Sequence, residues 1–173
     1  RLVYEFERFG SLINSYLKTG SYQSVYANLE TNQVVSDAFY KSVEDGVPVY
    51  DINETVEALT VVKSAIEISP IQKAVDVTVQ GFSEVLKTIE PGMYEYEVEA
   101  LFDYIFRLNG CYWSAFPAII ASGLNINTLH YHANQRQMLK GELVMIDYGA
   151  EYGYYAADIT RTLFVRTVNT TKS

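Results

Sequence analysis

The sequence predicts an α+β fold, in which two long helices are followed by a sheet. Between residues 71 and 106, apolar side chains recur at helical spacing in two runs that are separated by Pro91-Gly92. After residue 110, short apolar segments alternate with turns that are rich in Gly and Asn. Helices that come before strands, and do not alternate with them, favour an α+β layer arrangement over a parallel α/β sheet.

The first 60 residues predict a smaller α/β segment. Apolar residues at near-helical spacing predict a helix over residues 3–17, which ends at Gly20. Residues 24–30 are expected to form a strand, residues 36–43 a short helix, and residues 47–52 a strand that Pro48 interrupts.

The two long helices carry clear boundary signals. Ser64 and Glu67 form a capping-box pattern ahead of an apolar stripe. Pro70 lies inside this helix, so we expect a kink or a late start. A second stripe predicts a helix over residues 95–108 that ends at Asn109-Gly110. The first stripe consists of Ile71, Ala74, Val75, Phe82, Val85, Leu86 and Ile89.

Strands are expected over residues 116–121, 129–131, 143–147 and 155–165, with a tight turn at Tyr152-Gly153. This turn would place Asp147 directly opposite Asp158, with the two Cβ atoms about 5 Å apart. Two carboxylates held so close repel each other unless a cation neutralises them, so the pair is a candidate for half of a divalent metal site. The alternative is a pair of solvated aspartates, or one aspartate that pairs with Arg161.

Composition places the chain among globular proteins, with 49% hydrophobic and 20% charged residues. A formal charge of −8 argues against nucleic-acid or anionic-membrane binding, which needs clustered Lys and Arg. No apolar stretch is long enough to span a membrane, and Cys111 is the only cysteine, so we expect a cytoplasmic protein without an intrachain disulfide. The start at Arg1, without Met, suggests a processed or partial chain.

An ordered series of motifs over residues 60–166 closely resembles the pita-bread metallopeptidases, in the branch of the Xaa-Pro aminopeptidases and Xaa-Pro dipeptidases. The metal-binding hairpin of that family is similar to residues 141–162. The other matching segments are residues 63–68, 71–74 and 91–93, Ala115-Phe116-Pro117, residues 120–123 and Thr128-Leu129-His130-Tyr131.

The resemblance implies the first half of a pita-bread catalytic domain over residues 61–173, preceded by the end of a smaller domain over residues 1–60. It implies two divalent ions, with Mn²⁺ expected and Co²⁺ or Zn²⁺ as alternatives, for which Asp147 would bind one ion and Asp158 would bridge both. His130 would donate a hydrogen bond to the substrate or to the tetrahedral intermediate. The other ligands, a histidine and two glutamates, would belong to a second half beyond Ser173.

The expected activity of the complete enzyme is hydrolysis of an N-terminal Xaa-Pro bond in a peptide with proline at its second position, by a homodimer. The 173-residue chain alone is expected to bind metal weakly and to lack peptidase activity. The alternatives are a methionine aminopeptidase, a metal-free creatinase-like hydrolase, which the two aspartates disfavour, and a non-catalytic module that binds peptides or proteins.

Three further residues lie near these motifs. His132 could be a second imidazole ligand, but we expect it to be a histidine near the surface that does not bind metal. Thr160 could hydrogen-bond a metal ligand, or could simply favour a strand. Cys111 has no neighbouring His-Asp pattern, so we do not expect a nucleophile there.

Overall fold

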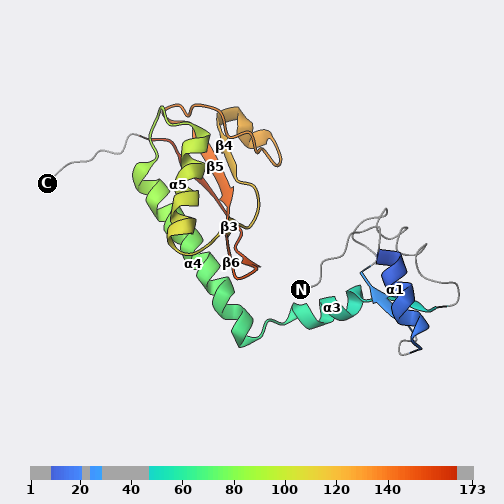
Figure 1. Cartoon of the computed structure of the whole chain (residues 1–173). Helices are drawn as coiled ribbons and strands as arrows, with labels where there is room; N and C mark the ends of the chain where they lie inside the picture. The colour runs from blue at the N-terminus through green and yellow to red at the C-terminus, as the bar shows by residue number, and fades with distance from the viewer. Residues whose placement is uncertain (1–8, 21–23, 29–46, 167–173) are drawn as a thin grey trace. The chain divides into compact units, whose positions relative to one another are not determined.

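The computed structural model describes residues 9–20, 24–28 and 47–166. The chain divides into two compact units, residues 1–63 and residues 64–173 (Figure 1). The sequence places the domain boundary at residue 60, and the domain identities expected on either side of it stay predictions. None of the described helices is both long and apolar enough to cross a membrane.

In the first unit, helix α1 (Phe9–Lys18) is followed by two short parallel strands, β1 (Val25–Ala27) and β2 (Val49–Asp51). The two strands lie within the segments that the sequence predicts, and α1 ends one residue beyond the predicted helix of residues 3–17. The helix expected over residues 36–43 lies outside the described residues. Helix α3 (Asn53–Val61) was not expected; it begins where Asp51 Oδ1 accepts a hydrogen bond from the backbone N–H of Asn53 at 3.0 Å.

The second unit begins with the two predicted long helices, α4 (Ala65–Thr88) and α5 (Glu95–Leu108). The capping box at Ser64 and Glu67 is present, and α4 begins at Ala65 and continues through Pro70, so the expected late start was wrong. Leu86 was also predicted to face the core, but its side chain is 51% exposed. The remaining stripe packs α4 against α5, and the two helices lie side by side against the strands (Figure 1).

The strands form two small antiparallel sheets. One has the order β3-β6-β7, formed by Trp113–Ser114, Ala150–Tyr152 and Tyr155–Ala156. The other has the order β4-β5-β8, formed by Ile119–Ser122, Leu143–Tyr148 and Ile159–Phe164, so β5 is the central strand. The short 3-10 helix η2 (Gly123–Asn127) follows β4. Residues 129 and 130 lie in a turn and residue 131 lies in neither a helix nor a strand, so the strand predicted over residues 129–131 was wrong.

A cluster of aromatic side chains joins the helices to the central strand. Phe102 of α5 packs edge to face against Phe82 of α4, Phe106 and Tyr148, with ring centroids 5.0 to 5.8 Å apart. A buried hydrogen bond adds to this packing, because the Thr78 hydroxyl of α4 accepts the backbone N–H of Ala150 at 3.0 Å. The face of β5 that carries Tyr148 is therefore fixed by the helices, and its opposite face carries Asp147.

Candidate metal and catalytic site

All three site residues that the sequence predicts line one cavity of about 330 Å³. The two aspartates come from the sheet, and His130 comes from the turn after η2. The remaining walls are apolar or aromatic, apart from a second imidazole. The lining residues are Phe116, Pro117, Ile119, His130, His132, Asp147 and Asp158.

The predicted register of the aspartates was wrong by two positions. Tyr152 pairs with Tyr155, so the turn residues are Gly153 and Tyr154, and both adopt positive φ, at 59° and 70°. Two central residues with positive φ define the type I′ turn, whose twist matches that of a hairpin. Asp147 therefore pairs with Thr160, and its other neighbour in the sheet is Ile119 of β4.

A shift by two positions keeps every side chain on its own face of the sheet, so Asp158 still lies on the side of Asp147. Extension of the same register places Asp158 opposite Gly149. A Cβ atom built on Gly149 would lie only 1.7 Å from the carbonyl oxygen of Ala157. Glycine at this position therefore lets the strand that leads to Asp158 approach β5 closely.

None of the salt bridges among the described residues involves either aspartate. The loss of hydration, followed by the charge of Asp147 and a hydrogen bond with it, raises the pKa of Asp158 above its usual value. Arg161, the alternative partner, donates to the backbone carbonyl of Thr160 and forms none of the described salt bridges with either aspartate. The alternative of an Arg161 pair is therefore not supported.

Asp147 carries the clearest sign of an incomplete site. Its Oδ1 atom is buried and is the one side-chain polar atom among the described residues that is buried without a hydrogen-bond partner. A buried acceptor without a donor costs free energy, and more so when it is charged. A divalent cation that is bound by Asp147 and Asp158 would satisfy this oxygen, so the residues fit a metal. No group of three or more His, Cys, Asp and Glu side chains among the described residues could hold a metal ion.

Both histidines of the chain lie at this cavity. His130 adopts positive φ, 52°, and its ring stacks on that of His132, with an interplanar angle of 9° and centroids 6.2 Å apart. His132 was expected near the surface, and its side chain is exposed. It also lines the cavity, and its Nδ1 lies 3.3 Å from the carbonyl oxygen of Ala118. His132 therefore belongs to the local environment of the site.

Comparisons with known proteins show the family of the chain. The model of metallopeptidase family M24 matches residues 69–172. The chain belongs to this family. An Xaa-Pro aminopeptidase of Haemophilus influenzae is 30% identical over 92% of the chain, and an Xaa-Pro dipeptidase of Pyrococcus furiosus is 36% identical over 68% of it. The chain spans 37% and 34% of these relatives, which is less than half of their length.

Solved structures confirm the predicted α+β pita-bread fold. Proline aminopeptidase P II from Yersinia pestis superposes on 93% of this M24 chain with a TM-score of 0.80 and 27% identity. Aminopeptidase P from E. coli, in a low-pH form, superposes on 90% of it with a TM-score of 0.77 and 30% identity. The matches cover 39% and 38% of those two chains.

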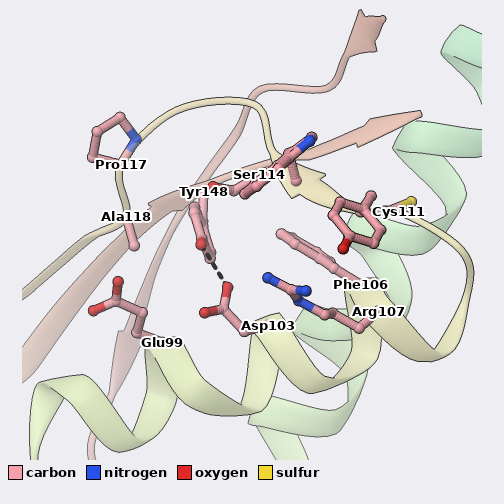
Figure 2. Close-up of a pocket in the computed structure, with 11 residues that line it drawn as sticks. Glu99, Asp103, Phe106, Arg107, Cys111, Ser114, Pro117, Ala118 and Tyr148 are labelled. Carbon is pink, nitrogen blue, oxygen red and sulfur yellow. Dashed lines mark hydrogen bonds between the residues drawn. The ribbon is translucent and has the colours of Figure 1, made fainter. Parts of the chain in front are cut away.

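A second cavity, of about 210 Å³, lies on the other face of β5 in this M24 chain (Figure 2). Here the Tyr148 hydroxyl donates a 2.7 Å hydrogen bond to Asp103, and Glu99 accepts one of 2.8 Å from Asn134. Cys111 also lines this cavity, and its burial raises the pKa of the thiol, which disfavours a nucleophilic thiolate. The carboxylates of this cavity therefore have partners.

Sequence reasoning missed one buried acidic residue, Glu95. It is the first residue of α5 and is fully buried, and its carboxylate accepts hydrogen bonds from the segment that carries both histidines. The signal is visible in the sequence, because Glu95 lies in phase with Val98 and Phe102 on the buried stripe of the helix. A charged residue at such a position needs several partners when it is buried.

Proposed function

We propose that this chain supplies metal ligands and a hydrogen-bond donor to a metal-dependent peptidase that hydrolyses the N-terminal Xaa-Pro bond of peptides. The observation that carries the proposal is the buried Asp147 Oδ1 atom without a partner, in a cavity shared with Asp158 and His130. The relatives described above are named as Xaa-Pro aminopeptidase and Xaa-Pro dipeptidase, which favours this substrate class over that of a methionine aminopeptidase.

In this proposal, Asp147 and Asp158 hold divalent metal, with Mn²⁺ as the expected ion. Bound metal would polarise the scissile carbonyl and lower the pKa of a water molecule so that hydroxide forms near neutral pH. A non-catalytic module would need neither paired carboxylates nor a buried acceptor that lacks a donor. The cytoplasmic location and the homodimer stay predictions.

His130 has a different role in the proposed reaction. An imidazole N–H at the cavity can donate to an oxygen on which negative charge develops during attack on the peptide bond. The apolar wall formed by Phe116, Pro117 and Ile119 excludes water from one side, which strengthens such a hydrogen bond. Thr160, opposite Asp147, stays a candidate to hydrogen-bond a metal ligand.

Titration of the 173-residue chain with Mn²⁺, followed by the loss of the free Mn²⁺ electron paramagnetic resonance signal, tests the proposal. We expect weak binding, which falls at least about tenfold in Asp147→Asn and in Asp158→Asn, since each substitution removes an anionic ligand. Asp103→Asn is the matched control, because it changes a carboxylate that faces the other cavity. Equal binding by all four proteins, or a loss only in the control, would overturn the assignment.

A further inference from the structure

We propose that Glu95 is a positioning residue that holds His130 and His132 at the cavity. Residues 123–136, here called the histidine loop, connect β4 to the short bridge that Gln137 forms with Tyr94. The loop contains η2 and, after it, both histidines. It has no long strand or helix to fix it, so its conformation depends on contacts with the rest of the unit.

Glu95 contacts the loop at both ends and in the middle. Its Oε1 atom accepts hydrogen bonds from the backbone N–H and the hydroxyl of Ser122, at 2.8 and 2.7 Å, and from Asn125 Nδ2 at 3.1 Å. Its Oε2 atom accepts from the Tyr131 hydroxyl at 2.7 Å and from the backbone N–H of Arg136 at 3.0 Å. One side chain thus closes the loop at its base and also fixes the residue between the two histidines.

The backbone at His130 explains why such a contact is needed. Positive φ at a residue other than glycine is unfavourable, and it persists where the surrounding structure holds it. The next residue, Tyr131, is tied to Glu95 through its hydroxyl group. This bond therefore opposes relaxation of His130 to a more favourable φ, which would turn its ring away from the stacked position on His132.

The chemistry of the network favours glutamate over glutamine. An ionised carboxylate only accepts hydrogen bonds, and it offers about four lone-pair positions to the five donors. Burial on its own would raise the pKa of Glu95, but the hydrogen bonds from Ser122, Tyr131 and Arg136 outweigh that effect and lower it. In a Glu95→Gln protein, the side-chain N–H₂ group would face at least two of those donors, and it cannot accept a hydrogen bond from them.

The inference deepens the proposed function, on which it rests for the role of His130, but it can be tested without metal or peptide. The chain contains only two histidines, so histidine-selective ¹³C labelling reports both site rings and nothing else. We expect Glu95→Gln to displace both ring signals and to speed hydrogen exchange of the Ser122 and Arg136 amides about tenfold. Unchanged ring signals in a folded Glu95→Gln protein would overturn the proposal.

Glu97→Gln is the matched control, because it makes the same change on the same helix. Glu97 is exposed and accepts a hydrogen bond from the backbone N–H of Tyr94, outside the histidine loop. The histidine ring signals of Glu97→Gln should therefore match those of the wild type. If Glu97→Gln displaced the histidine ring signals as much as Glu95→Gln does, the effect would be a general one of changes in α5, and the proposal would be overturned.

Tyr131→Phe keeps the proposal testable if Glu95→Gln fails to fold. It deletes one hydroxyl group and leaves the other four bonds to Glu95, so the fold should survive. We expect displaced ring signals with unchanged amide protection in α4. Ring signals identical to those of the wild type would overturn the proposal. A chain that failed to bind Mn²⁺ but gave the expected signals would count against the metal site alone.

Discussion

Two carboxylates that lie on opposite sides of β5, Asp103 of α5 and Asp147 of β5 itself, have different surroundings. Asp103 faces the second cavity and accepts a hydrogen bond from Tyr148, whose pKa is raised by burial and by the charge of Asp103, so the hydroxyl keeps its proton. Asp147, which directly precedes Tyr148 in β5, has a buried carboxylate oxygen that accepts no hydrogen bond. The difference separates a carboxylate that stabilises the fold from one that is available to a cation.

The largest expected effect is that of Gly149→Ala, which would disturb both faces of β5. The added Cβ would overlap with the carbonyl oxygen of Ala157, which belongs to the backbone and can move only with the strand that leads to Asp158. We expect a loss of about 3 kcal/mol or more in the free energy of unfolding. Urea unfolding followed by circular dichroism measures this, and a change below about 0.5 kcal/mol would show that the strands can separate.

Acid should weaken the histidine loop. Because the pKa of Glu95 in the folded protein is below its usual value of 4.5, its ionisation stabilises the fold above that pH. This contribution is lost as the pH falls through the folded pKa. Thermal unfolding at a series of pH values should show wild-type stability falling below about pH 4.5, and less steeply in Glu95→Gln. If the unfolding temperatures of the wild type and Glu95→Gln fell equally steeply with pH, this prediction would be contradicted.

Asp103→Asn tests the face on which the carboxylate has a partner. Replacement by an amide weakens a hydrogen bond to a charged acceptor, and the site is partly exposed to water, so we expect a loss of about 1 kcal/mol. Tyr148→Phe is the matched variant, because it removes the donor of the same bond. A double-mutant cycle that gave no coupling energy between the two positions would contradict the assigned contact.

Asp147→Asn tests the other face and should have the smallest effect, with the opposite sign. In metal-free protein it removes a charge next to Asp158, and an amide can donate to that carboxylate, so we expect a gain of about 0.5 kcal/mol. Differential scanning calorimetry in the presence of a chelator measures this. Destabilisation similar to that of Asp103→Asn would remove the distinction between the two faces.

The sequence predicted those parts of the fold that depend on local signals. The bounds of α5 agree with the prediction, because its apolar stripe and its end at Asn109-Gly110 lie within the helix itself. The capping box of α4 is equally local, and the type I′ turn was misplaced by only one residue because Tyr154 adopts a φ that usually selects Gly or Asn. The motif resemblance selected the three residues that share the cavity.

The histidine loop could not be predicted in the same way. Leu129-His130-Tyr131 has the composition of a strand but does not form one. The Tyr131 hydroxyl instead donates a hydrogen bond to Glu95, a residue far away in the sequence. The position of His132 depends on the same contacts. Long-range bonds of this kind override local propensity, and neither spacing nor periodicity reveals their partners.

Adjacent placement of Asp147 and Tyr148 limits which genetic changes β5 can tolerate. Side chains in a strand alternate between faces, so deletion or insertion of one codon ahead of Asp147 would exchange the two environments. The carboxylate would enter the aromatic cluster, and the phenol would take its place in the cavity. A change of length by a single residue in this strand would therefore destroy the core and the site together.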